Sequence, residues 1–276
     1  MDTSTKTRRE IAGRPRAVVT TSWDDNAAIG TRVGDLLGKK GMRGTFYVVS
    51  GQLGRGDEFT AADLRSLAAN GFEIGAHTIS HRLLTELSPT EMSREVGGCK
   101  PVLEQILGKE VVMFCYPRGR FNADVLREVQ RAGYGGARTT RMLCFDDVFR
   151  PLEMPTTVQA YPHTRSNYLR NAARLGGVSA LIASAAEMVQ FESWIQLGKK
   201  LFDQVLRDGG VWHLYGHAWE LERLNLWAQL EEMLDYVSGY EGVAYLTNAE
   251  LLQRVKSQDE IGGTAIAANR EHSLAH

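Results

Sequence analysis

The chain has 276 residues, and its charge is nearly balanced, with 32 basic and 33 acidic residues and a formal net charge of −1. This balance, and the lack of a basic cluster, argue against a nucleic-acid partner. A hydrophobic content of 43% can fill the core of a globular domain, but no apolar run approaches the length of a transmembrane helix.

The two ends of the chain differ in composition from its middle. Residues 1–15 are polar and charged, and residues 257–276 have no apolar period. We expect a disordered lead and a flexible tail there, with a single domain at 16–256. Because the first residues lack the apolar segment of a secretory signal, we expect a cytoplasmic protein. The three cysteines have no zinc-binding spacing, which predicts reduced, buried thiols.

Short apolar strands and amphipathic helices alternate through the predicted domain. The strands are expected at residues 16–25, 43–50, 72–78, 111–117, 134–140, 211–217 and 242–247. The helices are expected at residues 27–41, 60–71, 88–108, 122–133 and 219–237, with a loop-rich stretch at 141–166 and a further helical region before residue 211. This alternation predicts an α/β fold with a parallel sheet, and the number of units favours a barrel. In such a fold, reactive groups collect at the carboxyl ends of the strands.

Two histidines, His77 and His81, stand four residues apart in the sequence HTISH at the end of a predicted strand. They do not form the helical zinc-protease motif, because Thr78 occupies the position of its glutamate. Alone, they are more simply explained as ordinary surface or core histidines. With Asp25 from an earlier strand end, they would supply two imidazoles and one carboxylate, a donor set of catalytic zinc sites. Asp25 could equally cap the following helix.

Two further groups at predicted strand ends could move protons. Asp24 lies directly before Asp25, and a base there could deprotonate a water that a metal activates. In the stretch GGVWHLYGH, His213 and His217 share one face of the predicted strand. His217 lies at the mouth of the strand and could act as a general acid toward a leaving amine. His213 could instead be an interior residue that is hydrogen-bonded to a neighbour.

The ordered motifs TTSWDD, HTISH, CYPRG and GGVWHLYGH resemble those of the polysaccharide deacetylases, carbohydrate esterase family 4 with the NodB-homology domain. The resemblance covers residues 16–254 and implies a distorted (β/α)7 barrel in a single domain. It also implies a metal-dependent amidase, usually with zinc, that removes acetyl groups from N-acetylated sugars. It makes Asp24 the catalytic base and His217 the general acid, and it makes the metal ligands Asp25, His77 and His81.

The resemblance extends to the substrate groove. Pro117, Arg118 and Gly119 would form one side of the groove, with the backbone N–H of Arg118 helping to hold an oxyanion. The expected substrate-binding residues are Trp23, Tyr116, Pro117, Arg118, Arg138, His213 and Trp219.

One position departs from the family pattern in a way that bears on the base. Cys115 stands where many members have an arginine paired with the catalytic aspartate. Asp24 would then need another cation to set its pKa, and Arg118 and Arg138 are the candidates. The aspartate–tryptophan motif that many members carry before the last motif is not recognisable. These departures leave the metal triad intact and put the identity of the substrate in doubt.

The sequence therefore predicts a metal-dependent deacetylase that acts on an N-acetylated sugar or on a lipid- or nucleotide-linked intermediate of glycan biosynthesis. Two alternatives stay open. One is a C–N hydrolase of a small amide, such as a ureide or a cyclic imide, on a similar fold. The other is a non-catalytic carbohydrate-binding barrel, in which sugars could stack on Trp23, Tyr116, Trp212 and Trp219. Such a protein would not need both Asp24 and His217. The sequence predicts no particular oligomeric state.

Overall fold

The structure is a computed structural model, and it describes residues 16–25, 27–174 and 193–257. The predicted lead at 1–15 and residues 258–276 of the predicted tail lie outside the described residues. Parallel strands form one sheet in the order β5-β4-β3-β2-β1-β7-β6, with β8 paired to β1 as well. The strands are β1 (Ala17–Asp24), β2 (Thr45–Val48), β3 (Glu73–Ala76), β4 (Met113–Cys115), β5 (Gly136–Arg138), β6 (Val158–Gln159), β7 (Gly210–His217) and β8 (Val243–Leu246).

Strand β1 is the centre of the sheet. All 8 of its residues are buried, as expected for a strand whose two faces are both covered. β7 pairs along its full length, whereas β8 pairs with Ala17–Thr20 and β2 with Ser22–Asp24. β1 thus contacts three strands and carries Asp24 to the carboxyl edge of the sheet.

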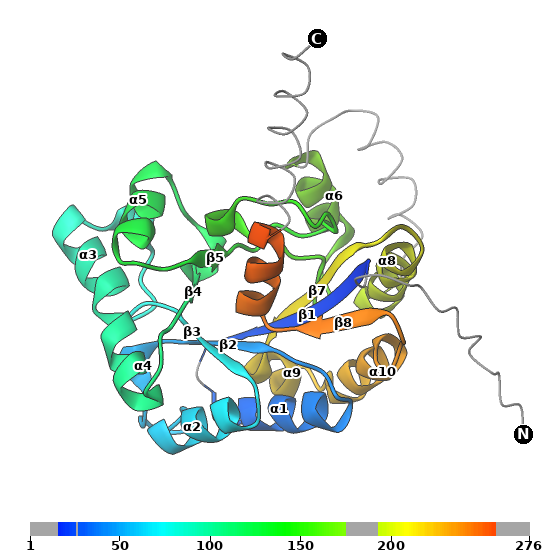
Figure 1. Cartoon of the computed structure of the whole chain (residues 1–276), viewed down its shortest axis with the longest axis horizontal. Coiled ribbons are helices and arrows are strands. Elements are labelled where there is room, and N and C mark those ends of the chain that lie inside the picture. Colours follow the sequence, from blue (N-terminus) through cyan, green and yellow to red (C-terminus); the bar gives the residue numbers. More distant parts are fainter. Residues whose placement is uncertain (1–15, 26, 175–192, 258–276) are drawn as a thin grey trace, which may run out of the picture.

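The sheet curls into a distorted barrel (Figure 1). The carbonyl of Met154 accepts a hydrogen bond from the N–H of Thr139, and the N–H of Met154 donates one to the carbonyl of Ala137, both at 2.8 Å. These bonds connect the end of β5 to the segment that leads into β6, and β6 pairs with β7. The predicted parallel α/β barrel is confirmed. The predicted loop-rich stretch at 141–166 also contains β6, a strand that was not predicted because its 2 residues are too few to show a strand period.

Helices cover the outside of the barrel (Figure 1). They are α1 (Gly30–Lys39), α2 (Ala61–Ala69), α3 (Pro89–Gly97), α4 (Cys99–Leu107), α5 (Ala123–Arg131), α6 (Arg165–Arg174), α8 (Trp194–Asp208), α9 (Ala218–Arg223) and α10 (Trp227–Val237). Short 3-10 turns are η1 (Ser50–Gln52), η2 (Leu84–Glu86), η3 (Pro117–Gly119) and η4 (Pro151–Glu153). The larger core cluster joins helix residues such as Leu37 and Phe202 to outward-facing strand residues such as Val19, Trp23 and Phe46.

A second core cluster fills the inside of the barrel. It joins inward-facing strand residues to Leu251 and Leu252, which belong to a helix at residues 248–257. The first turn of this helix donates backbone N–H groups to Thr45 Oγ1 and Glu73 Oε2, each at 2.9 Å. Thr45 and Glu73 are the first residues of β2 and β3. The helix therefore closes the amino end of the barrel and leaves the carboxyl end for a site.

Two predicted helices are each broken in two. The predicted helix at 88–108 is α3 and α4, which are separated at the pair Gly97–Gly98. Pro101 lies in the first turn of α4, where it cannot donate a hydrogen bond to the preceding turn and its ring clashes there, so one continuous helix is disfavoured. The predicted helix at 219–237 is α9 and α10. Asn225, between them, has a φ of 52°, a conformation that right-handed helices do not contain.

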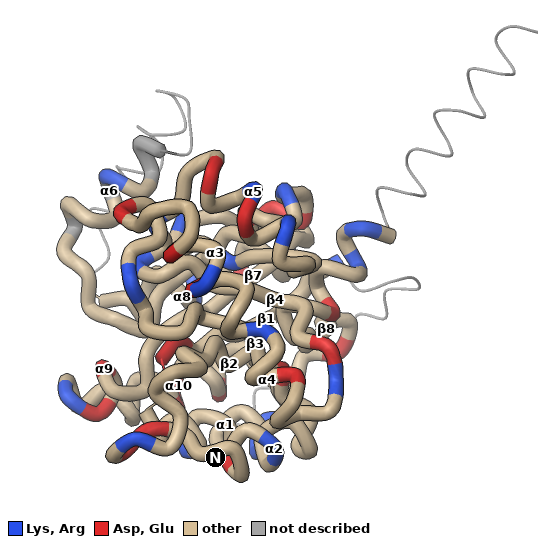
Figure 2. The backbone as a smooth tube through the Cα atoms, turned by 90° about the vertical axis from the view of Figure 1, so that its left-hand side faces the viewer, with Lys and Arg blue, Asp and Glu red and all other residues tan. Residues whose placement is uncertain are grey.

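Acidic and basic residues are interspersed over the surface. Figure 2 shows Lys and Arg positions next to Asp and Glu positions along the outer elements of this view, without a face of a single sign. This distribution agrees with the nearly balanced charge of the sequence. Within the ranges that the structure describes, no helix is both long and apolar enough to span a membrane.

Candidate active site

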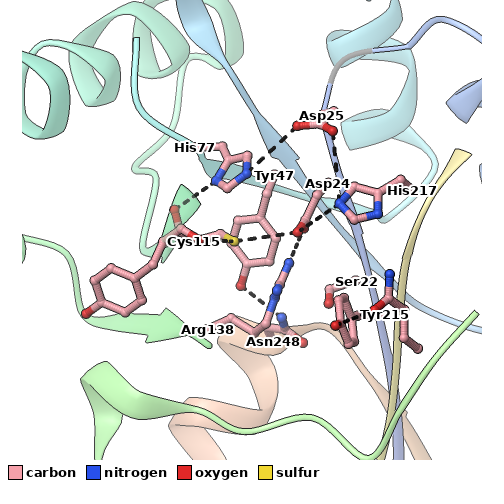
Figure 3. A network of polar contacts seen from close by, with 12 residues as sticks. Ser22, Asp24, Asp25, Tyr47, His77, Cys115, Arg138, Tyr215, His217 and Asn248 are labelled. Carbon is pink, nitrogen blue, oxygen red and sulfur yellow. Dashed lines mark hydrogen bonds and ion pairs between the residues drawn. The ribbon is translucent and has the colours of Figure 1, made fainter. Parts of the chain in front are cut away.

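The chemically active side chains lie together at the carboxyl edge of the barrel (Figure 3). They come from the ends of five strands, as Asp24 on β1, His77 after β3, Cys115 on β4, Arg138 on β5 and His217 on β7. Because the strands are parallel, residues that are far apart in the sequence reach the same edge. The structure thus brings the predicted site residues of these strands into one network.

The predicted metal ligands face one another. Asp25 Oδ1 lies 3.9 Å from His77 Nε2 and 3.8 Å from His81 Nε2, and the ligand atoms of the three residues lie within 4.8 Å of one another. A tetrahedral zinc with ligands at about 2.0–2.1 Å would hold its donor atoms about 3.4 Å apart. Side-chain shifts of a few tenths of an ångström would therefore let the three atoms share one ion, and the donor set fits a divalent metal.

Neighbouring groups orient two of these ligands. His77 Nδ1 donates to the carbonyl of Cys115 at 2.8 Å, which leaves Nε2 with its lone pair toward Asp25. Burial lowers the pKa of His77 to about 4 despite the nearby carboxylates, so the imidazole is neutral near pH 7. Trp219 Nε1 donates to Asp25 Oδ2 at 2.9 Å, and Oδ1 is the oxygen that faces the histidines. Both interactions favour metal binding by the free ligand atom.

A second group of donor atoms, from Asp24, His77 and Cys115, is fully buried and shares His77 with the first. Burial raises the pKa of the Cys115 thiol well above its usual value, although Arg138 opposes this. Cysteine binds metals as the thiolate. The protonated thiol makes this group a poorer fit for an ion than Asp25, His77 and His81.

The loop that carries His81 is strained and held by a buried carboxylate. Thr78 and His81 have positive φ values of 67° and 59°, as do Asp25 and Arg118 at 68° and 54°. Such conformations are costly for residues other than glycine and persist where the surroundings fix them.

The carboxylate of Glu95 holds this loop through three hydrogen bonds. Its Oε2 accepts the backbone N–H groups of Ile79 and Ser80 at 3.0 and 2.8 Å, and its Oε1 accepts the Ser80 hydroxyl at 2.6 Å.

Replacing Glu95 with alanine is expected to weaken metal binding about 10- to 100-fold, because outer-shell partners orient the ligands. The loop N–H groups would lose their acceptor, at a cost of about 1–3 kcal/mol in the free energy of unfolding. Isothermal titration with zinc and urea unfolding would measure the two effects. Glu91→Ala is the matched control, because Glu91 lies on the same helix and caps it through Ser88. Wild-type zinc affinity in Glu95→Ala would contradict the prediction.

Asp24 is paired with a buried arginine from a neighbouring strand. Arg138 Nη2 donates to Asp24 Oδ1, and both side chains are buried. The guanidinium lies between the rings of Tyr47 and Tyr215, at 5.2 and 5.0 Å from their centroids. Its Nε and Nη1 have no hydrogen-bond partner among the described residues, and the two rings cover its faces. Of the two predicted cations, Arg138 contacts Asp24, whereas Arg118 is exposed.

The charges around Asp24 keep it ionised. Burial alone would raise the pKa of Asp24, but Arg138, together with His77 and His217, lowers it to about 2. Cys115, which occupies the position of the family arginine, has its Sγ 3.7 Å from Asp24 Oδ2. The cation that the sequence lacks at residue 115 is thus supplied by Arg138 from β5.

His217 is held between a glutamate and the two aspartates. Its Nδ1 donates to Glu220 Oε2 at 2.7 Å, and its Nε2 lies 3.9 Å from Asp24 Oδ2 and 4.0 Å from Asp25 Oδ2. Burial alone would lower the pKa of His217, but the Glu220 hydrogen bond and the aspartate charges raise it above its usual value. A protonated Nε2 can therefore face the metal site. The sequence did not predict this role of Glu220, because Glu222 follows two residues later and either glutamate could face His217.

Known proteins that match this chain support the resemblance that the order of its motifs predicts. Residues 12–137 match the family model named polysaccharide deacetylase. YxkH of Bacillus subtilis, whose name assigns it to these enzymes, is 28% identical over 105 residues, which are 38% of this chain and 38% of YxkH. Residues 12–137 are thus similar to the polysaccharide deacetylase family.

Further polysaccharide deacetylases resemble this chain in sequence or in fold. The peptidoglycan-N-acetylmuramic acid deacetylase PdaC of Bacillus subtilis is 26% identical over 125 residues, which are 45% of this chain and 26% of PdaC. A structure from Mycobacterium smegmatis, named for the same family, superposes with a TM-score of 0.61 and 16% identity over 90% of this chain and 94% of that one. The chain spans 38% or less of the length of the curated relatives it matches. The structural likeness, at this identity, shows the shared fold.

Several residues predicted to line a substrate groove lie elsewhere. Trp23 and Tyr116 are 1% and 0% exposed, so the prediction that they stack on sugars is wrong. Trp23 packs under the outer helices, and the Tyr116 hydroxyl donates to the carbonyl of Leu152 at 3.0 Å. Trp219 is 36% exposed and lies beside His217, with the Arg223 guanidinium 5.1 Å from its ring centroid. Aromatic residues at strand ends therefore divide between core and site.

His213 is an interior residue of the barrel. Its Nε2 lies 2.8 Å from Ser22 Oγ, and its Nδ1 donates to the carbonyl of Pro155 at 3.0 Å. It is 1% exposed, and burial lowers its pKa to about 3. Both ring nitrogens are occupied by protein partners, so its predicted part in substrate binding is not supported by a free donor or acceptor. Pro117 is buried beside the exposed Arg118 in η3.

Proposed function

We propose that this protein is a metal-dependent hydrolase that removes an acetyl group from an N-acetylated sugar, with zinc as its ion. The convergence of a carboxylate and two imidazoles on one point, beside a second, ionised carboxylate and a fifth residue that can carry a proton, supports the proposal most directly. Nitrogen and oxygen donors with an open position are typical of catalytic zinc sites.

In the proposed reaction, the chain's own residues move the protons. An ion held by Asp25, His77 and His81 would polarise the acyl carbonyl and lower the pKa of water. Asp24, which Arg138 keeps ionised, accepts the proton of the attacking water. His217 then gives its Nε2 proton to the departing nitrogen while Glu220 holds Nδ1. The backbone N–H of Arg118 is the proposed oxyanion donor, and acetate and a free amine are the products.

The proposed substrate class is an N-acetylated glycan or its lipid- or nucleotide-linked precursor. The name of the relative PdaC states an action on peptidoglycan N-acetylmuramic acid, which favours an amino sugar here. The Trp219 ring is partly exposed, lies 5.5 Å from the His217 ring and has the Arg223 guanidinium over it, so its exposed part is the proposed aromatic contact for a sugar at the mouth of the site.

Metal analysis combined with acetate release tests the function. We expect about one zinc per chain, acetate release from N-acetylglucosamine oligomers or peptidoglycan fragments, and loss of release after chelation that added zinc restores. Full acetate release by the metal-free protein would contradict the mechanism. Turnover of a ureide or cyclic imide without acetate release from any sugar would instead support a small-amide hydrolase.

A further inference from the structure

Gln159 connects the edge of the barrel to the candidate general acid. It is the second residue of the short strand β6, it is 6% exposed, and it lies opposite Tyr215 of β7 in the sheet register. Its side-chain Nε2 donates to Glu220 Oε2 at 3.2 Å. Glu220 Oε2 is the same oxygen that accepts Nδ1–H of His217 at 2.7 Å. A single buried carboxylate oxygen thus joins Gln159 to His217.

The orientation of the Gln159 amide is fixed by three partners. Its Oε1 accepts the hydroxyl of Tyr215 at 2.6 Å and Nε2–H of His163 at 2.7 Å. In the flipped orientation the carbonyl oxygen would face the Glu220 carboxylate, which offers no proton, and the amide NH2 would face the two donors. Only the observed orientation gives every group a partner, so Gln159 is a dedicated donor to Glu220.

The hydrogen bonds continue away from the site to the start of α6. His163 Nδ1 accepts from Asn167 Nδ2 at 3.2 Å, which completes the partners of a neutral imidazole with its proton on Nε2. Donation therefore runs from Asn167 through His163 to Gln159 and then to Glu220, which also accepts from His217. Such a chain is fully satisfied, and fully satisfied polar networks hold their members rigidly.

The Gln159 donor fixes the orientation of the Glu220 carboxylate, which the short helix that carries Glu220 does not fix by itself. α9 has 6 residues and begins directly after His217, and the Glu220 side chain is buried. Without Gln159, Oε2 of Glu220 would keep Nδ1–H of His217 as its donor and could rotate with it. The β6 strand is fixed in the sheet by its pairing with β7, so Gln159 supplies a rigid point of attachment.

We propose that Gln159 is a positioning residue that fixes the Glu220 carboxylate and thereby aims Nε2 of His217 at the leaving nitrogen. The inference rests on the proposed hydrolase function, in which His217 acts in the transition state. Loss of the Gln159 donor would then lower kcat rather than raise KM, because the interaction matters where proton transfer occurs.

Three variants of the 276-residue chain test this role. Gln159→Leu removes the donor, Gln159→Glu keeps the shape but replaces the donor with an acceptor, and Gln229→Leu is the control. Gln229 is a partly buried glutamine that accepts Trp194 Nε1–H at 2.8 Å on α10, outside the site. We expect Gln159→Leu and Gln159→Glu to lower kcat about tenfold or more with KM changed less than about twofold. Gln229→Leu should lose stability with wild-type kcat.

Nitrogen-15 NMR of the histidine side chains gives a readout that does not depend on turnover. The Nδ1–H signal of His217, assigned by its absence in His217→Gln, should move in both Gln159 variants and stay in place in Gln229→Leu. An unmoved signal, or wild-type kcat in Gln159→Leu, would overturn the inference. If the wild-type protein releases no acetate, the proposed function fails, while the NMR signal still decides whether Gln159 holds the Glu220–His217 pair.

Discussion

Arg138→Met is expected to lower the rate of acetate release by at least about 100-fold, the lower range for loss of a working general base. The reason is that Asp24 would remain buried without the cation that keeps it ionised. Removing one partner of a buried ion pair also costs about 3–5 kcal/mol in the free energy of unfolding. Arg141→Met is the control, because Arg141 pairs with Glu153 at an exposed position and should cost less than about 1 kcal/mol.

The stability loss in Arg138→Met is expected to depend on pH. The pKa of Asp24 is about 2 in the folded protein, below the ordinary 3.8. A depressed carboxyl pKa contributes stability that is fully present above about pH 4 and is lost as the pH falls toward 2, here about 2 kcal/mol. The difference in unfolding free energy between wild type and variant should therefore shrink between pH 4 and pH 2. Urea unfolding at a series of pH values measures it, and a constant difference would contradict the assigned pair.

A rescue variant tests whether Asp24 needs only a nearby positive charge or needs the arginine at position 138. Cys115 lies on the adjacent strand with its Sγ 3.7 Å from the same carboxylate. Cys115→Arg, introduced together with Arg138→Ala to provide space, should recover part of the acetate release that Arg138→Ala alone loses. Recovery would show that Asp24 needs a guanidinium from either strand. A double variant no better than the single one would mean that Arg138 also acts through its stacking on the two tyrosines.

The sequence could predict that the proposed metal ligands lie together, because their proximity depends only on the order of the strands. Asp25 and His77 follow separate strands, and in a parallel sheet both strand ends must lie at the same edge. Neither the strained backbone of Asp25 and His81 nor the Glu95 carboxylate that holds the loop was visible in the sequence. These features depend on packing between α3 and the strands, which no local pattern encodes.

The arginine that pairs with Asp24 and the burial of Trp23 both depend on which face of the sheet each side chain points to. Asp24 points into the network at the barrel mouth, so Trp23, one residue earlier, must face the outer helices. This alternation was available in the sequence and would have predicted the burial of Trp23. Arg138 is the last residue of β5, a strand of 3 residues, so the sequence does not predict which face of the sheet its side chain points to. Only the folded sheet distinguishes it from Arg118.

The polar partners of His217 were the least predictable part of the site. Gln159 lies in a stretch without strand periodicity, and its strand exists because β7 offers a pairing edge. Glu220 is one of two glutamates in the first turns after the strand, and the sequence does not say which one faces His217. Tertiary contacts decide which residues hold His217 in place, and these contacts are not visible in the sequence. The position of His217 itself could be predicted from its motif and from the order of the strands.

His77→Ala is expected to abolish stable metal binding and to lower acetate release by about 1,000-fold or more, since the ion is proposed to supply several kcal/mol of transition-state stabilisation. The variant loses one of the three proposed ligand atoms and also the hydrogen bond to the Cys115 carbonyl. Metal analysis after dialysis and the acetate assay measure the two losses. Full zinc content with full acetate release in this variant would exclude His77 as a ligand.

Because His77→Ala removes a buried side chain, its loss of metal binding and activity must be distinguished from unfolding of the protein. A ligand that binds only the folded state raises the melting temperature, so added zinc should stabilise the wild-type protein and leave His77→Ala unaffected. His213→Ala is the matched control, because His213 is equally buried, at 1% exposed, but is bonded to Ser22 and Pro155 rather than facing Asp25. It should lose stability and still gain melting temperature with zinc. If His213→Ala also lost the response to zinc, the effect of His77→Ala would be one of packing, and the assignment of Asp25, His77 and His81 as the ligands would fall.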